Sequence, residues 1–268
     1  MLIVAERINA TRKRIAKAIK NKNEKLIRKE ARKQARSGAD YIDVNAGSDP
    51  AAEVENLVWL TNVAQDATDK PLSLDSPNPD ALKAAFEAYR GDDLIINSVT
   101  AEQARLDAVL PLVRESGAKV IALAMGDGGL PTGVDDRLAL ARKMADAAAE
   151  YDIAPERIYL DPCVQPVSTS PGQAEAALET FRRVKTDMPG VHTICGLSNV
   201  SFGLPYRNLV NRAFLTLALQ AGMDAAIIDP TEEEMVATML AAEAVLGVDE
   251  WCMAYVTAER EGRLRPDS

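Results

Sequence analysis

The chain has 268 residues, 47% of them hydrophobic, and a formal net charge of −9. This acidic balance argues against nucleic acid binding, because affinity for phosphates depends on clustered cations, and no apolar run approaches the ~20 residues that span a bilayer. The first residues lack the layout of a signal peptide. Cys163, Cys195 and Cys252 are widely spaced and odd in number, which argues against a disulfide framework and for a reducing compartment. We therefore expect a cytoplasmic protein.

Eight short apolar segments have the length and composition of buried parallel strands. In chain order they span residues 2–5, 41–44, 71–74, 94–96, 120–124, 158–160, 191–195 and 225–228. Helical patterns lie between them, at residues 24–37, 51–68, 80–89, 137–150, 173–185, 209–221 and 234–246.

Several residues mark expected helix ends. Gly38 is a stop signal after the first of these helices. Asp49 and Asn78 each precede a proline, as an N-cap followed by proline in the first turn would. Thr100 and Thr231 are each followed three residues later by Gln or Glu, the pattern of a capping box.

The alternation of strand and helix predicts an α/β fold, namely a single (β/α)8 TIM barrel over residues 1–268. The alternative is a doubly wound open sheet, but residues 6–9 do not form the glycine-rich turn that usually follows its first strand. Residues 247–268 are expected to form a C-terminal tail. Its apolar part, residues 251–256, is predicted to cover the barrel base or a neighbouring subunit, and residues 260–268 to be frayed.

The segment between Arg12 and Arg36 is strongly basic. Two interpretations stay open for it, a solvated helix face and a surface that docks an acidic partner. Its cations include Lys17, Lys20, Lys22, Lys25, Arg28, Lys29, Arg32, Lys33 and Arg36.

Almost every predicted strand finishes in a carboxylate or a side-chain amide. In a barrel of this kind the active site is built at the carboxyl ends of the strands, so these side chains are expected to meet at one mouth. Buried carboxylates need partners, and Arg7 and Arg207 are the obvious cations nearby. The sequence therefore predicts a neutral ligand with several N–H donors. The polar residues at or near these ends include Glu6, Asn9, Asp43, Asn45, Asp75, Asn97, Asp127, Asp161, Ser198, Asn199 and Asp229, with Met125 after the fifth strand.

Several familiar chemistries lack their residues. The one histidine, His192, is expected at the bottom or in the interior of the barrel, so no Ser-His-acid set is available. No Cys and His spacing suits zinc, and lysine is scarce at strand ends, which disfavours Schiff-base chemistry. We expect no protein-bound metal.

The strand-end residues resemble those of a known family. Residues 6–9 (Glu-Arg-Ile-Asn), 43–45 (Asp-Val-Asn), 74–76 (Leu-Asp-Ser), 96–98 (Ile-Asn-Ser), 161–162 (Asp-Pro) and 196–201 (Gly-Leu-Ser-Asn-Val-Ser) are similar to the pterin-binding methyltransferases, and more narrowly to the methyltetrahydrofolate:corrinoid/iron–sulfur protein methyltransferases. The similarity extends to about Val256, and the string at 196–201 is its specific part.

The resemblance implies roles for individual residues. Asp75, Asn97 and Asp161 match positions that hydrogen-bond the pterin ring, and Asn199 matches the residue near the methyl-bearing nitrogen. Asn199 and Asp161 are thereby the implied catalytic residues. Gly196, Ser198 and Arg207 match other ring-contacting positions, and Phe202 stands where some members have glutamine. Further candidates at the mouth are Glu6, Asn9, Asp43, Asn45 and Met125.

The implied reaction moves a methyl group between tetrahydrofolate and the Co(I) corrinoid of a separate corrinoid protein, in either direction. The family is usually homodimeric. Three alternatives remain: a tetrahydromethanopterin-dependent methyltransferase, a pteroate synthase and a non-catalytic folate binder. The pteroate synthases carry a strand-end lysine and an Arg-x-His near the end of the chain, and neither is found here.

Overall fold

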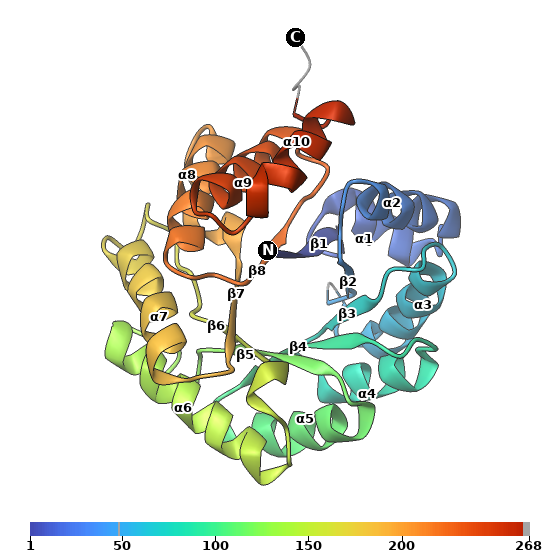
Figure 1. Ribbon diagram of the computed structural model, residues 1–268. Coiled ribbons are helices and arrows are strands. Elements are labelled where there is room, and N and C mark those ends of the chain that lie inside the picture. The colour runs from blue at the N-terminus through green and yellow to red at the C-terminus, as the bar shows by residue number, and fades with distance from the viewer. Residues whose placement is uncertain (48, 265–268) are drawn as a thin grey trace.

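The computed structural model describes residues 1–47 and 49–264, which form a closed barrel of eight parallel strands inside a ring of helices (Figure 1). Each strand pairs with its neighbours in sequence, and β8 pairs with β1. This topology confirms the predicted TIM barrel over the open sheet. The strands are β1 (Leu2–Asn9), β2 (Tyr41–Asn45), β3 (Leu72–Asp75), β4 (Leu94–Thr100), β5 (Lys119–Leu123), β6 (Ile158–Asp161), β7 (His192–Gly196) and β8 (Ala225–Ile228).

The helices follow the strands and bury their apolar faces against the barrel. No helix within the described ranges is long and apolar enough to cross a membrane. The α-helices are α1 (Lys13–Lys20), α2 (Glu24–Arg36), α3 (Glu53–Gln65), α4 (Pro79–Ala88), α5 (Gln103–Ser116), α6 (Val134–Glu150), α7 (Gln173–Asp187), α8 (Arg207–Gln220), α9 (Glu233–Val245) and α10 (Met253–Arg260). The 3-10 turns are η1 (Pro155–Arg157), η2 (Leu197–Ser201) and η3 (Glu250–Cys252).

Two of the predicted helix ends are confirmed. Asn78 caps α4, since its side chain accepts a hydrogen bond from the backbone N–H of Asp80 and Pro79 occupies the first turn. Gly38 has a φ of +95°, a left-handed conformation that ends α2 without the strain a side chain would add.

Three other helix-start predictions are wrong. Asp49 does not cap a helix, because α3 begins at Glu53 after Ala52. Thr100 belongs to β4, which runs longer than expected, and its buried hydroxyl has no hydrogen-bond partner among the described residues. The hydroxyl of Thr231 donates to the carboxylate of Asp229, which directly follows β8, and therefore does not cap the backbone of α9.

Successive side chains of each strand point alternately into and out of the barrel, so the interior is filled in layers. Its lower part is an apolar cluster that takes one residue from almost every strand: Val4, Tyr41, Ile95, Ile121, Tyr159, Ile194 and Ala225. Side chains two positions further along a strand point to the same side, so Asp43, Asn97 and Asp161 enter the barrel directly above this cluster. The interior is therefore closed below and polar towards the mouth.

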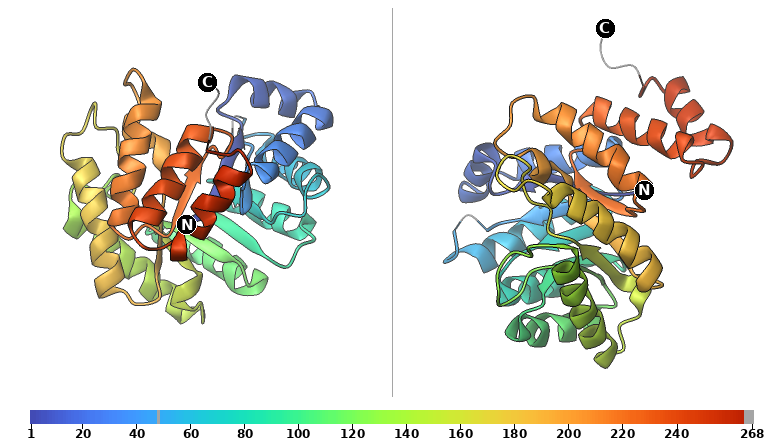
Figure 2. Two further views of the ribbon diagram at one scale, coloured as in Figure 1. Left: turned by 45° about the horizontal axis from the view of Figure 1, so that its top comes forward. Right: turned by 90° about the vertical axis from the view of Figure 1, so that its left-hand side faces the viewer.

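The two ends of the barrel are easily told apart in Figure 2, where the N-terminus lies at the end opposite to α1 in the right-hand view. The C-terminal segment folds back as α10 beside α9, outside the ring of strands (Figure 1). Val248, Trp251 and Met253 line a hollow together with Met1, which precedes β1. Ala258 anchors it by being fully buried, whereas Trp251 is 90% exposed. The last predicted tail residues, 265–268, lie outside the described residues.

Candidate functional site at the barrel mouth

The carboxyl ends of the first four strands place their polar residues side by side. Strand pairing sets Asn45 opposite Asp75, and Asp75 opposite Asn97. The side-chain amide of Asn45 donates a hydrogen bond of 3.0 Å to Oδ2 of Asp75. Asn9 pairs with Asn45, but its side chain turns to its own loop and accepts from Thr11. Asp75 and Asn97 are thus presented to a ligand, and Asn9 shapes the rim.

Asp43 lies one layer below this row, where it is completely buried. Its Oδ1 accepts hydrogen bonds from the Ser73 hydroxyl at 2.7 Å and from the Asn97 amide at 3.2 Å. Burial, with the neighbouring Asp75 charge, raises its pKa well above the ordinary value. Burial also raises the pKa of Asp75 to about 6, although Asn45 and Asp43 oppose that rise by hydrogen bonding to it. Burial therefore favours the protonated form of Asp43, while Asp75 is mostly ionised at neutral pH.

Asp161 faces the mouth from β6 and links this strand to β7. Its Oδ1 accepts from the backbone N–H of Cys163 at 2.8 Å, and its Oδ2 accepts from that of Gly196 at 3.4 Å. Burial raises the pKa of Asp161 to about 6, and these two hydrogen bonds limit the rise. Arg137, which is fully buried, supports the same loop by donating to the carbonyl oxygen of Pro162 at 2.6 Å.

Strand β7 ends at Gly196, one residue beyond its predicted end, and Ser198 and Asn199 belong to the 3-10 turn η2. The side-chain amide of Asn199 is exposed and makes no hydrogen bond to another described residue. A Cβ added at Gly196 would lie 3.1 Å from Nδ2 of Asn199. Glycine at 196 therefore leaves room for this amide, and its N–H connects the amide's turn to Asp161.

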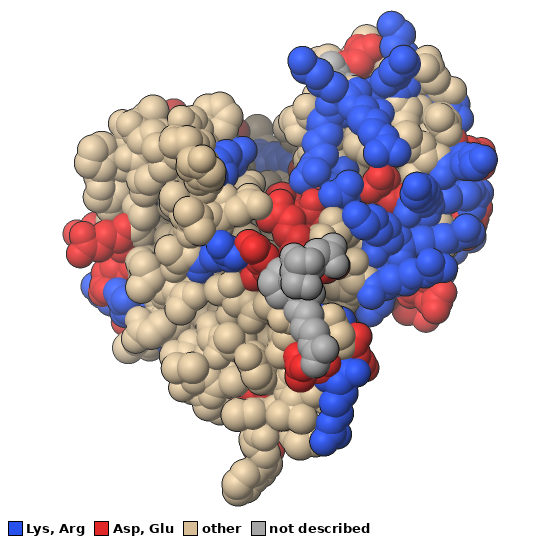
Figure 3. All heavy atoms as spheres, turned by 90° about the horizontal axis from the view of Figure 1, so that it is seen from above, with Lys and Arg blue, Asp and Glu red and all other residues tan. Residues whose placement is uncertain are grey.

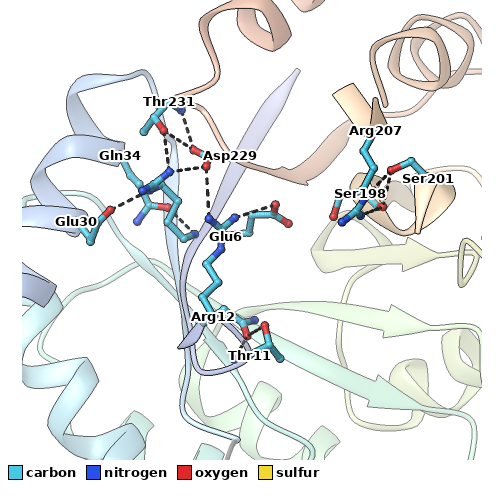
Figure 4. A network of polar contacts seen from close by, with 12 residues as sticks. Glu6, Thr11, Arg12, Glu30, Gln34, Ser198, Ser201, Arg207, Asp229 and Thr231 are labelled. Atoms are coloured by element: carbon cyan, nitrogen blue, oxygen red, sulfur yellow. Dashed lines mark hydrogen bonds and ion pairs between the residues drawn. The ribbon is translucent and has the colours of Figure 1, made fainter. Parts of the chain in front are cut away.

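Arg207 stabilises the turn that carries Asn199. Its guanidinium donates to the carbonyl oxygen of Ser198 at 2.6 Å and to the hydroxyl of Ser201 at 3.0 Å (Figure 4). Phe202 is 65% exposed, so it packs against little of the folded chain. In this arrangement Arg207 holds a loop, and direct ring contacts by Arg207 and Phe202 stay predictions.

Arg7 lies beside the strand ends, as the sequence predicted, and its guanidinium is paired within the fold. It donates to Glu30 on α2 at 2.9 Å and to Asp229 at 2.7 Å, which joins α2 to the end of β8. Arg12 lies 3.5 Å from Glu6 and 3.7 Å from Asp229. Figure 4 shows Glu6 between this group and the turn held by Arg207, and burial raises the pKa of Glu6 to about 7.

Arg105 on α5 is a supporting residue that the sequence did not reveal. It donates to the carbonyl oxygens of Ser76 at 2.8 Å, Pro77 at 2.6 Å and Ser98 at 2.5 Å, so it fixes the loops after β3 and β4 together. Beneath it, the Ser76 hydroxyl donates to the buried carboxylate of Glu53 at 2.6 Å. An arginine in the first turn of a helix has no sequence signal that would distinguish it from a solvated one.

With this geometry established, similarity to known proteins identifies the family. Residues 5–229 match the family of pterin binding enzymes. The chain is 38% identical over 271 residues to a methylcorrinoid:tetrahydrofolate methyltransferase from Eubacterium limosum, an alignment that covers 99% of this chain and 98% of that protein.

The chain belongs to the pterin-binding methyltransferases.

More distant relatives share part of this picture. A methionine synthase from Mycobacterium tuberculosis is 30% identical over 85% of this chain, which corresponds to 20% of that longer protein. The crystal structure of dihydropteroate synthase from Xanthomonas albilineans with 7,8-dihydropteroate superposes with a TM-score of 0.66 at 21% identity, covering 92% of this chain and 91% of that one. At that identity the likeness establishes the fold alone.

Two further predictions concern Met125 and His192, which lie at opposite ends of the barrel. Met125 follows β5 and is half-buried, and its carbonyl oxygen accepts from the N–H of Ala101. His192 begins β7 and stacks on Tyr159 with ring centroids 4.8 Å apart, which confirms its place at the bottom of the barrel. Among the described residues no group of three or more His, Cys, Asp or Glu side chains has the geometry to hold a metal ion.

Proposed function

We propose that this protein transfers a methyl group between N5 of tetrahydrofolate and the cobalt of a corrinoid carried by a separate protein. The full-length similarity to a methylcorrinoid:tetrahydrofolate methyltransferase carries this proposal. The mouth supports it, because carboxylates and amides that share one rim suit a ligand rich in N–H groups.

Ring recognition is assigned to Asp75, Asn97 and Asp161. A pterin presents an amino group and ring N–H groups, which ionised carboxylates accept, together with ring acceptors that an amide serves. Asp43 accepts a hydrogen bond from the Asn97 amide and orients it from below. Asn45 holds the Asp75 carboxylate in place. The ligand therefore meets groups that are already fixed, which lowers the ordering cost of binding.

Catalysis is assigned to the free amide of Asn199, with Asp161 beside it through Gly196. When the methyl group moves from cobalt to N5, the nitrogen loses its proton to water and cobalt keeps the bonding electrons as Co(I). In the reverse direction N5 must gain positive character before it can leave. An amide cannot supply a proton, but its N–H donates a hydrogen bond that strengthens as charge develops. The same group assists both directions.

The decisive experiment mixes the purified protein with 5-methyltetrahydrofolate and free Co(I) cobalamin. Loss of the Co(I) spectrum and appearance of methylcobalamin, dependent on the protein, is the expected result. Incubation with methylcobalamin and tetrahydrofolate follows the opposite direction. Absence of transfer in both mixtures, for a protein that binds the folate, would leave a folate binder and overturn the proposal. Replacing the folate by its methanopterin counterpart tests the alternative methyl carrier.

The protein is further proposed to act as a homodimer in the cytoplasm. Around the end of α9 and η3, several large apolar side chains are exposed, which is unusual for a monomer's surface. We call this the C-terminal apolar surface, formed by Val245, Leu246, Val248, Trp251, Met253, Tyr255 and Val256.

A further inference from the structure

Twelve of the chain's 31 lysines and arginines lie between Arg12 and Arg36, with only two of its 40 carboxylates. In space they cover α1 and α2, where lysine and arginine gather on the right-hand side of Figure 3. The remainder of the chain is strongly acidic, so this is a marked separation of charge. The proposed reaction chemistry uses none of these lysines.

Part of this basic surface is concave. A groove of about 530 Å³ runs between α1 and the beginning of α3. Lys17, Lys20 and Lys22 line it, and Asp49 and Glu55 lie on its other side. Lys22 is already paired with Glu55 at 2.9 Å and with the side-chain oxygen of Asn56 at 2.8 Å. Lys17 and Lys20 have no ion pair or hydrogen bond with their side chains among the described residues.

The groove opens at the same end of the barrel as the candidate site. Helix α1 follows Asn9, and the loop with Asp49 follows Asn45, the two residues that continue the row of Asp75. The right-hand view of Figure 2 places α1 and the loop before α3 at the end opposite to the N-terminus. A ligand whose head is bound at Asp75 therefore emerges at the end of the barrel where this groove lies.

The arginines around the mouth are already engaged. Arg7 and Arg12 face carboxylates, and Arg105, Arg137 and Arg207 donate to backbone carbonyls. Lys17 and Lys20, by contrast, offer ammonium groups one helical turn apart to an incoming anion.

We infer that this groove binds the glutamate tail of the folate, so that the enzyme prefers folates with several γ-linked glutamates. The inference rests on the proposed function, since it concerns the same ligand. Tetrahydrofolate ends in one glutamate, and further residues add one carboxylate each. An extended α-linked residue spans about 3.5 Å, and a γ-linked one is longer, so each addition extends the reach from the mouth towards Lys17 and Lys20.

The test compares dissociation constants of tetrahydrofolate monoglutamate and triglutamate by isothermal titration calorimetry. Two or three exposed ion pairs are expected to make the triglutamate bind about tenfold more tightly, and this gain should shrink as salt screens the charges. In the K17Q/K20Q variant the gain should disappear while monoglutamate affinity is retained. Lys22 stays unchanged because it is paired within the fold.

The matched control is K25Q/K29Q, which removes two exposed charges from α2 outside the groove and should keep the gain. Equal affinity of the wild type for both folates overturns the inference and leaves the proposed function intact. A control that loses as much as K17Q/K20Q also overturns it, because the effect would then be that of overall charge. K17Q/K20Q that slows transfer to a corrinoid protein without changing either affinity would assign the lysines to an acidic protein partner instead. If neither folate binds, the proposed function fails and the inference with it.

Discussion

The free amide of Asn199 is the residue on which catalysis depends most directly. Asn199→Ala is expected to lower the rate of methyl transfer to free Co(I) cobalamin by about 10²-fold or more, as for the loss of one aimed donor. Folate affinity should change little, because the ring contacts are assigned to other strands. Stopped-flow measurement of cobalt absorbance gives the rate, and Asn208→Ala, which removes an exposed amide from the first turn of α8, serves as the control. An unchanged rate would remove Asn199 from the mechanism.

Asp75 and Asp161 make folate binding sensitive to pH. Burial raises the pKa of each to about 6, and N–H donors of the ligand bind the ionised forms. The folate dissociation constant should be constant above pH 7 and should rise below about pH 6, by up to tenfold per pH unit for each carboxylate. Calorimetric titrations between pH 5 and 8 measure this. Asp75→Asn should weaken binding and reduce the slope, and an unaltered slope would exclude Asp75.

The same two residues have an opposite effect on folding. Because their pKa values are raised from 3.8 to about 6, the folded chain binds more protons than the unfolded chain between these values. Their contribution to stability therefore falls as pH rises through this window. The ionised mouth that binds folate is thus obtained at some expense of stability.

At the scale of elements, Arg105 shows how a helix outside the barrel positions the site. Arg105→Ala frees three backbone carbonyls after β3 and β4, and we expect it to weaken folate binding by about tenfold and to lower the free energy of unfolding by about 1–3 kcal/mol. Calorimetry and urea denaturation measure the two effects. Arg114→Ala is the control, because Arg114 lies on the same helix and pairs with Asp152 at the surface. Equal effects of both changes would contradict this role.

The elements themselves were largely predictable from sequence, for identifiable reasons. Buried parallel strands are short apolar runs, so their number, order and barrel closure follow from a pattern that each segment displays locally. Because the carboxyl ends of all eight strands lie at one end of the barrel, the strand-end residues could be predicted to meet there. Helix starts were less predictable: Thr100 has the spacing of a capping box, yet pairing of β4 with β5 keeps it in the sheet. Most of the hydrogen-bond partners of Arg7, Arg105 and Arg137 lie far from them in the sequence. The supporting roles of these arginines could therefore be recognised only in the structure.

At the scale of the whole molecule, the C-terminal apolar surface predicts self-association. The wild type is expected to have a solution mass of twice 28.9 kDa by light scattering. The variant V248S/W251S should be monomeric and folded, since Val248 and Trp251 are 67% and 90% exposed and support little of the core. Leu130→Ser, at an exposed apolar residue after β5, is the control that should remain dimeric. A dimer that survives V248S/W251S would place the interface elsewhere.

The guanidinium groups of Arg105 and Arg137 hold the loops at the mouth by donating hydrogen bonds to backbone carbonyl oxygens. These hydrogen bonds do not involve the side chains of the loop residues. The loop path should therefore tolerate randomisation at Pro77 and Ser98, whose carbonyl oxygens Arg105 contacts. This makes the barrel a convenient starting scaffold for laboratory selection of altered pterin preference, with the anchoring arginines left untouched.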